Sequence, residues 1–308
     1  MTELDFIEEL KTLKKQVIIG DSFNIPEHFD NIVISGMGGS GIVGKLFSEL
    51  YHTKPVICLD DYNIPDFVGK DTVFIGISYS GNTEETISCT NQALKKGAHV
   101  YAITSGGDLS GLVKEKVIIP SGLQPRSAIG YMLMPLLNTF LHIDAEKREA
   151  LSRLINEIDE HHEEASKLGK EISLEKKIPA IYGFSPFRYV AYRWKTQFNE
   201  NSKLMAINNY FPELNHNDTM SLRDTYLKET FFFITFGGSS GKISRRIDAT
   251  EKVTSTKFFK VTPLGNDDIE KMFYLIHFGD YMSLETAISR KMDPRDVSSI
   301  EDLKRLIK

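Results

Sequence analysis

Short apolar runs alternate with helix-like stretches along the whole 308-residue chain. In the first half, runs rich in β-branched and aromatic residues predict five strands, at 31–35, 55–60, 72–78, 99–104 and 117–120. Amphipathic or mainly apolar stretches predict helices at 42–50, 82–96 and 127–141. Apolar strands that alternate with helices predict a parallel sheet covered on both faces.

The same alternation starts again in the second half. Strands are predicted at 178–183, 203–208, 230–236 and 258–262. Helices are predicted at 189–201, from Lys242 onward, at 269–284 and at 296–308. A charged stretch without proline, at about 145–170, predicts a helix that connects the halves. The chain therefore reads as two α/β domains, 1–150 and 151–308, each an α/β/α sandwich around a doubly wound parallel sheet.

Composition narrows the class of protein. Hydrophobic residues make up 41% and charged residues 26% of the chain, which is typical of a soluble globular protein. The net charge of −5 and the absence of a dominant basic cluster argue against nucleic acid as a partner. The acidic, amphipathic N-terminus does not resemble a signal peptide, and no apolar run approaches the roughly 20 residues that span a bilayer. Two cysteines, Cys58 and Cys89, fit neither a metal motif nor a disulfide scaffold, so a cytoplasmic protein with reduced thiols is expected.

Two polar turns follow predicted strands of the first half. The segment 74–86 runs from an apolar strand through Ser78, Ser80 and Thr83 into a helix. A helix N-terminus offers unpaired N–H groups and the positive end of the helix dipole, and the hydroxyls add donors, so the segment predicts a phosphate site. The glycine-rich turn 36–41 contains G-x-G-x-x-G and by itself suggests a dinucleotide fold. That interpretation leaves the serines at 78 and 80 unexplained, whereas a sugar phosphate accounts for both turns.

The segment 76–86, Gly-Ile-Ser-Tyr-Ser-Gly-Asn-Thr-Glu-Glu-Thr, resembles the phosphosugar-binding signature of the sugar isomerase (SIS) domain family. The turn at 36–41 is similar to that family as well. The resemblance implies that the substrate phosphate is held by four hydroxyl groups and by the backbone of two glycines. These are Ser40, Ser78, Ser80 and Thr83, with Gly38 and Gly39.

Three further motifs occur in order: Gln-Pro-Arg-Ser-Ala at 124–128, Arg-Trp-Lys-Thr-Gln-Phe-Asn-Glu-Asn at 193–201 and Phe-Pro-Glu-Leu-Asn-His-Asn at 211–217. Together they resemble the archaeal-type bifunctional phosphoglucose/phosphomannose isomerases, which have two SIS domains. The resemblance covers nearly the whole chain. It implies interconversion of glucose 6-phosphate, mannose 6-phosphate and fructose 6-phosphate. This chemistry needs no metal, and the sequence shows no convincing site for a redox cofactor, so no cofactor is expected.

Aldose–ketose isomerisation moves a proton between C1 and C2 through a cis-enediol, so it needs a carboxylate base, a group that opens the ring and a cation near the enediolate. The resemblance implies that Glu200 is the base. It also implies that His216 assists ring opening from the neighbouring subunit of a homodimer, and that Lys304 lies near the ring oxygen. Arg126, at a predicted strand end, is a candidate for stabilising the enediolate, although a surface salt bridge would also explain it.

Several alternatives stay open. Glu213, three residues before His216, is a competing base. His216, Asp218 and Glu213 could imitate a metal cluster, but their spacing matches no known metal geometry. A glucosamine 6-phosphate-forming amidotransferase would carry an N-terminal cysteine glutaminase domain, which is not expected in a chain that begins Met1-Thr2-Glu3. A non-catalytic sugar-phosphate sensor would attach a DNA-binding domain to one SIS domain, whereas two halves fill these 308 residues.

Overall fold

The structure, a computed structural model, describes residues 3–238 and 241–307. By internal contacts the chain divides into two compact units. The first unit is Lys11–Asn156, and the second combines Met1–Leu10 with Glu157–Lys308. No helix among the described residues is both long and apolar enough to cross a bilayer.

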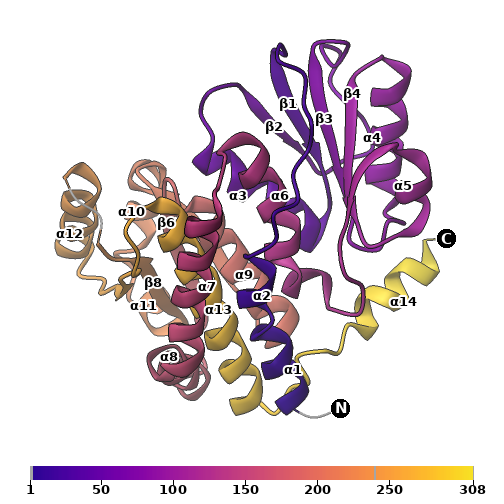
Figure 1. Cartoon of the computed structure of the whole chain (residues 1–308). Helices are drawn as coiled ribbons and strands as arrows, with labels where there is room; N and C mark the ends of the chain where they lie inside the picture. Colours follow the sequence, from indigo (N-terminus) through magenta and orange to yellow (C-terminus); the bar gives the residue numbers. More distant parts are fainter. Residues whose placement is uncertain (1–2, 239–240, 308) are drawn as a thin grey trace. The chain divides into compact units, whose positions relative to one another are not determined.

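The first unit is built on a five-stranded parallel sheet with the strand order β2-β1-β3-β4-β5 (Figure 1). The strands are β1 (Asn31–Ser35), β2 (Val56–Leu59), β3 (Thr72–Ile77), β4 (His99–Thr104) and β5 (Glu115–Ile118). All five predicted strands are present. The helices are α2 (Leu13–Gln16), α3 (Gly38–Leu50), α4 (Glu84–Lys95), α5 (Gly107–Leu112), the 3-10 helix η1 (Pro125–Ser127) and α6 (Ile129–Phe140).

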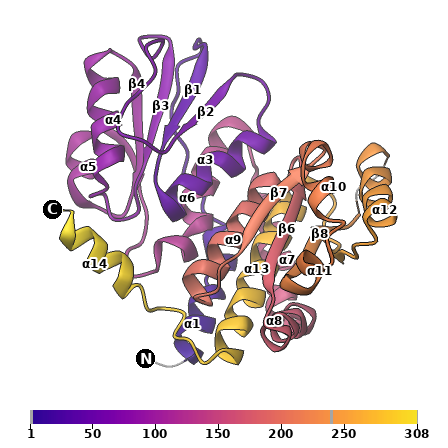
Figure 2. The ribbon, with the colours of Figure 1, turned by 180° about the vertical axis from the view of Figure 1, so that it is seen from behind.

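Both faces of this sheet are covered, as the apolar pattern predicts. Helices α3 and α6 lie on one face, and α4 and α5 on the other (Figures 1 and 2). On β1, Val33 packs with Cys89 and Ala93 of α4. Its neighbour Ile34 points the other way, because successive strand residues face opposite sides. There its Cγ2 would lie 2.8 Å from a Cβ placed on Gly44, so a glycine lets α3 approach the sheet closely.

Cys58 lies on β2 beneath α3, where burial raises the pKa of its thiol from 9.0 to about 11. Because the thiolate is the reactive form, at pH 8 the reactive fraction should be about a hundredfold smaller than for an unperturbed thiol. We therefore expect slow labelling of Cys58 by iodoacetamide at pH 8, with a rate that rises about tenfold per pH unit until pH 11. Mass spectrometry against a cysteine peptide measures this, and labelling at the peptide's rate at pH 8 would refute the burial.

The second unit contains a four-stranded parallel sheet with the order β7-β6-β8-β9 (Figure 2). The strands are β6 (Ile178–Phe184), β7 (Ile207–Phe211), β8 (Phe231–Phe236) and β9 (Phe259–Val261). Helix α9 (Arg188–Asn201) lies on β6 and β7, and α13 (Asp268–Ser289) packs against α9 and α8 (Glu163–Glu175). The remaining helices are α1 (Glu3–Leu10), η2 (Glu213–His216), α10 (Asp218–Ser221), α11 (Thr225–Thr230), α12 (Lys242–Thr254) and α14 (Ser298–Leu306).

The strand predicted at 203–208 is wrong in its position, because β7 begins only at Ile207. Lys203 adopts a left-handed backbone with φ of +48°, and the N–H of Leu204 donates to Phe198 O at 3.1 Å. These residues therefore close the C-terminal end of α9. The strand therefore begins further along the chain than predicted, beyond the residues that close α9.

The connecting helix predicted at about 145–170 is also not continuous. Helix α7 (Ala145–Glu160) ends before the two histidines, and α8 begins at Glu163. The break is held by distant residues of α13. Asp159 accepts hydrogen bonds from Tyr281 and His277, both at 2.7 Å, and the ring of His162 stacks on Tyr281. His277 is fully buried there.

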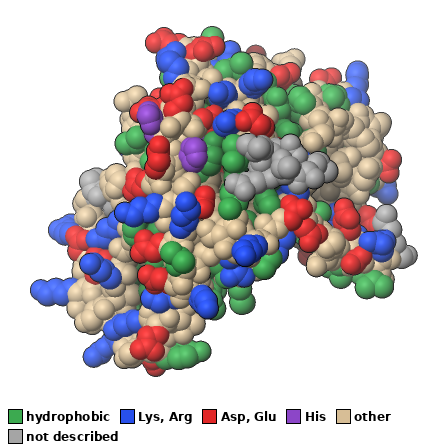
Figure 3. Space-filling model, turned by 90° about the horizontal axis from the view of Figure 1, so that it is seen from below, with side chains coloured by type: hydrophobic (Ala, Val, Ile, Leu, Met, Phe, Trp, Pro, Cys, Tyr) green, Lys and Arg blue, Asp and Glu red, His purple; other side chains and the backbone are tan. Residues whose placement is uncertain are grey.

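On the face shown in Figure 3, acidic and basic side chains are interspersed over the described residues. A protein that binds nucleic acid non-specifically gathers lysine and arginine on one face. The described part of this face carries mixed charge instead.

Candidate active site

The candidate phosphate turn occupies a topological switch point. Strands β1 and β3 are neighbours in the first sheet, with Ser35 paired to Gly76. The chain leaves β1 toward β2 on one side and leaves β3 toward β4 on the other. Ligands of doubly wound sheets bind beyond the carboxyl ends of the strands at such a point. Both polar turns that the sequence singles out, 36–41 and 78–83, start there.

Three hydroxyl side chains shape the turn after β3. The hydroxyls of Ser78 and Thr83 lie 2.8 Å apart, and the N–H of Gly81 donates to Ser78 Oγ at 3.1 Å. The N–H of Asn82 donates to Ser80 Oγ at 3.2 Å. Ser78 is fully buried, Ser80 is exposed, and Thr83 is the N-cap residue of α4. The hydroxyls therefore converge on a helix N-terminus, which is a ready site for an anion.

Ser40 joins the glycine turn to this hydroxyl turn. It is buried in the first turn of α3, and its Oγ accepts a hydrogen bond from the N–H of Tyr79 at 3.1 Å. The glycine turn itself becomes helical at Gly38, earlier than the predicted start at Ile42. A Cβ on Gly41 would lie 2.4 Å from Gly36 O, so only a glycine permits this tight entry into the helix.

Arg126 lies beside the same turn. A Cβ on Gly39 would lie 2.9 Å from the backbone nitrogen of Arg126, so the two segments touch through their backbones. The Arg126 side chain is only 3% exposed, and its Nη1 donates to Gln124 Oε1 at 3.2 Å. The side chain is therefore buried and does not lie on the surface. Gly38, Gly39, Ser40, Ser78, Thr83 and Arg126 all gather at one edge of the first sheet.

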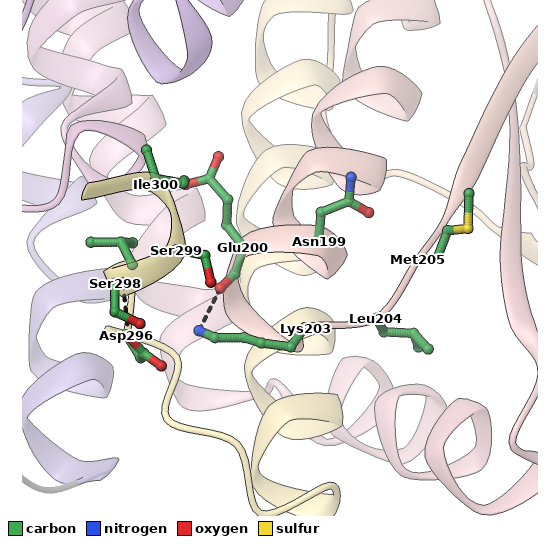
Figure 4. A pocket seen from close by; sticks show the side chains of 10 residues that line it. Asn199, Glu200, Lys203, Leu204, Met205, Asp296, Ser298, Ser299 and Ile300 are labelled. Atoms are coloured by element: carbon green, nitrogen blue, oxygen red, sulfur yellow. Dashed lines mark hydrogen bonds between the residues drawn. The ribbon is translucent and has the colours of Figure 1, made fainter. Parts of the chain in front are cut away.

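Glu200 stands at the C-terminal end of α9 in the second unit, beside a cavity of about 450 Å³. The cavity is lined by Asn199, Glu200, Lys203, Leu204 and Met205, and by residues 296–300. Figure 4 shows the Glu200 side chain reaching from α9 toward Ile300, in the first turn of α14. A carboxylate that borders a cavity of this size can accept a proton from a small bound molecule.

The walls of this cavity are tied together by short hydrogen bonds. Lys203 Nζ donates to the backbone oxygens of Glu200 and Asp293, at 2.7 and 2.6 Å. The N–H of Ser298 donates to Asp296 Oδ1 at 2.9 Å, and this hydrogen bond lowers the pKa of the Asp296 carboxyl. Asp296 is therefore ionised at neutral pH and accepts the N–H of Ser298, the first residue of α14.

The other two candidates of the second unit lie elsewhere. His216 is the last residue of η2 and is exposed, after a cis peptide bond between Phe211 and Pro212. Lys304 is exposed on α14. Neither lines the cavity beside Glu200 in the described part of the chain. In the same part, no group of three or more histidine, cysteine or acidic residues has the geometry of a metal site.

Sequence reasoning missed two supports of the site. The hydroxyl of Tyr79 donates to Pro120 O at 3.0 Å and accepts from the N–H of Leu123 at 2.9 Å, which ties the hydroxyl turn to the loop before Arg126. Asp280, a buried carboxylate in the apolar helix α13, is hydrogen-bonded to Arg193 of α9. An acidic residue inside an apolar helix was the available signal, since such residues are seldom buried without a partner.

Comparison with known proteins identifies the fold of both units. A family model described as "SIS domain" matches residues 28–125, and one described as "Bacterial phospho-glucose isomerase C-terminal SIS domain" matches residues 161–307. Both units are therefore SIS domains. A glucosamine-6-phosphate deaminase structure from Thermotoga maritima superposes with a TM-score of 0.72 over 95% of this chain and 96% of its own, at 18% identity, which shows the fold.

Two relatives carry the name bifunctional phosphoglucose/phosphomannose isomerase. The protein from Thermoplasma acidophilum is 53% identical over 304 residues, which are 99% of this chain and 98% of its own. The protein from Thermoplasma volcanium is 54% identical over 99% of this chain and 100% of its own. The chain thus belongs to the bifunctional phosphoglucose/phosphomannose isomerase family.

Proposed function

We propose that this protein interconverts glucose 6-phosphate, fructose 6-phosphate and mannose 6-phosphate. Membership of the family over almost the whole chain carries the proposal. The geometry of each unit is compatible with it, because one holds a hydroxyl-rich anion turn and the other a carboxylate beside a cavity.

The chemistry divides between the two units. Ser40, Ser78, Ser80 and Thr83 bind the phosphate, with the backbone of Gly38 and Gly39. His216 assists ring opening with Lys304 near the ring oxygen, and Arg126 stabilises the negative charge of the enediolate. Glu200 removes the proton from one carbon of the open-chain sugar and returns it to the other, which passes the substrate through a cis-enediol.

One base can serve both aldoses. Glucose 6-phosphate and mannose 6-phosphate differ only in configuration at C2. If the C2–C3 bond rotates while the enediol is bound, either face of C2 can turn toward Glu200. The same residues then produce both sugars from fructose 6-phosphate.

A coupled assay with fructose 6-phosphate tests this function. Glucose 6-phosphate and mannose 6-phosphate are each detected through a separate specific enzyme. Formation of both at saturable rates is the expected result. Formation of one aldose alone would refute the dual activity, and binding without turnover would indicate a sugar-phosphate sensor.

The same proposal includes a homodimer in which His216 serves the partner's site, and a cytoplasmic protein with free Cys58 and Cys89. The exposed position of His216, away from the lining of the cavity, supports a site shared between subunits.

We predict that mixing inactive Glu200→Gln and His216→Ala proteins restores activity. Random exchange makes half of the dimers hybrid with one intact site each, so about a quarter of wild-type activity is expected. Proven subunit exchange without recovery would count against a shared site.

A further inference from the structure

Helix α9, which carries Glu200, is fastened to α13 by a ladder of buried polar contacts. Arg193 Nη2 donates to both carboxylate oxygens of Asp280, at 2.8 and 3.0 Å. One turn later on α9, Gln197 donates to Oδ1 of the same carboxylate. After another turn, Asn201 Nδ2 donates to Ser283 Oγ at 2.9 Å. The ladder therefore follows one face of α9 down to the residue next to Glu200.

All members of this ladder are buried. Arg193 is 1% exposed and Asp280 3%, and Asn201 and Ser283 are fully buried. Replacing a buried ion pair with well-packed apolar residues is often neutral or stabilising, so stability alone does not explain the pair. A buried polar network instead holds the two helices in one arrangement. Any sliding or rotation of α9 against α13 leaves a buried charge without its hydrogen-bond partner.

The ladder fixes α9 at the point where the position of the helix matters for the chemistry. Ser202 Oγ donates to Ser283 O at 2.6 Å, directly after the last rung. Contacts to α13 thus come from residues 201 and 202, immediately following Glu200. A shift of the Glu200 backbone along or about the axis of α9 would have to break these contacts.

We propose that Asp280 is a positioning residue for Glu200. It holds α9 in a single axial and rotational register, so that the proposed base meets C1 and C2 of the substrate in a productive geometry. The inference rests on the proposed function and adds to it a residue that does not touch the substrate. A misplacement of about 1 Å at a reacting group is enough to slow a reaction by two orders of magnitude.

The test is Asp280→Asn, measured as kcat and KM with fructose 6-phosphate. The amide offers one acceptor oxygen where the carboxylate offers two, and in either orientation its NH2 group faces the donor of Arg193. We expect kcat to fall about tenfold to a hundredfold while KM stays within about twofold. A residue that only stabilises the fold would lower the amount of active protein and leave kcat per folded site unchanged.

A double-mutant cycle with Glu200→Asp separates positioning from general loosening. Shortening Glu200 already displaces its carboxylate, so Asp280→Asn should then lower kcat less than about threefold. An equal fold-loss in both backgrounds, a change confined to KM, or an unchanged kcat would each overturn the inference. No turnover in the wild-type protein would refute the proposed function and the inference with it.

Asp159→Asn is the matched control. Asp159 is also a buried carboxylate hydrogen-bonded to α13, through His277 and Tyr281, but it belongs to α7 and makes none of the printed hydrogen bonds to α9. Asp159→Asn should lower the midpoint of thermal unfolding and leave kcat within about twofold of the parent value. The same kcat loss in this control would overturn the inference. If Asp280→Asn does not fold, Ser283→Ala is measured in its place. We expect Ser283→Ala to lower kcat about threefold in the parent protein and by less in the Glu200→Asp background.

Discussion

Replacing Glu200 with glutamine is expected to lower kcat for fructose 6-phosphate by about a thousandfold and to leave the dissociation constant within about twofold. The amide has nearly the shape of the carboxylate but cannot take up a proton. The residues proposed to bind the phosphate belong to the first unit, and this substitution leaves them unchanged. The loss should therefore appear in kcat and not in binding.

Several contacts around Glu200 involve the backbone and neighbouring residues and do not involve its carboxylate. The backbone oxygen of Glu200 is held by Lys203, and the residues after it are held by α13, so none of these contacts uses the carboxylate. Turnover is measured by the coupled assay, and binding by calorimetry with the sugar phosphate. Thermal denaturation shows whether the variant is folded at the assay temperature.

Glu213→Gln is the matched control, because Glu213 was the competing base. It is exposed on η2, where its Oε1 accepts from Asn217 Nδ2 at 3.3 Å. We expect its kcat to stay within about threefold of the parent, as for a substitution at an exposed position. If Glu213→Gln abolishes turnover and Glu200→Gln does not, the two roles must be exchanged.

The strands of both units were predictable because each is a short β-branched or aromatic run between turn residues. The misplaced strand and the broken connecting helix show the limit. Lys203 takes a left-handed conformation that its own residue type does not favour, and it does so to close α9. The end of α7 depends on contacts with α13, more than a hundred residues away. Local patterns carry neither kind of information.

Part of the candidate site could be predicted from local sequence, and part depends on contacts between distant residues. Ser78, Ser80 and Thr83 lie within six residues, so their convergence at one helix N-terminus followed from sequence order. The burial of Arg126 could not be predicted from sequence order, because it depends on how η1 packs in the folded unit. The ladder that holds α9 joins residues 87 positions apart in the chain, at Arg193 and Asp280. These hydrogen bonds could be identified only from the folded structure.

Replacing Gly81 with alanine should lower the free energy of unfolding by about 3 to 5 kcal/mol and raise KM at least about tenfold. Gly81 has φ of +74°, and a Cβ there would lie 1.8 Å from the carbonyl oxygen of Gly106. Both contacting groups are backbone, so the turn after β3 must move away from the turn after β4. That movement displaces Ser78 and Thr83, which are proposed to bind the phosphate.

Gly97→Ala separates strain from displacement. Gly97 follows α4 with nearly the same backbone, φ of +76°, but a Cβ there meets no atom within 4 Å. Alanine should therefore add only the left-handed strain, about 1 to 2 kcal/mol, with KM unchanged. Urea denaturation and steady-state kinetics of both variants provide the comparison. If Gly81→Ala and Gly97→Ala lose equal stability and both keep the parent KM, the turn after β3 is not held by its contact with Gly106 and does not bind the substrate phosphate.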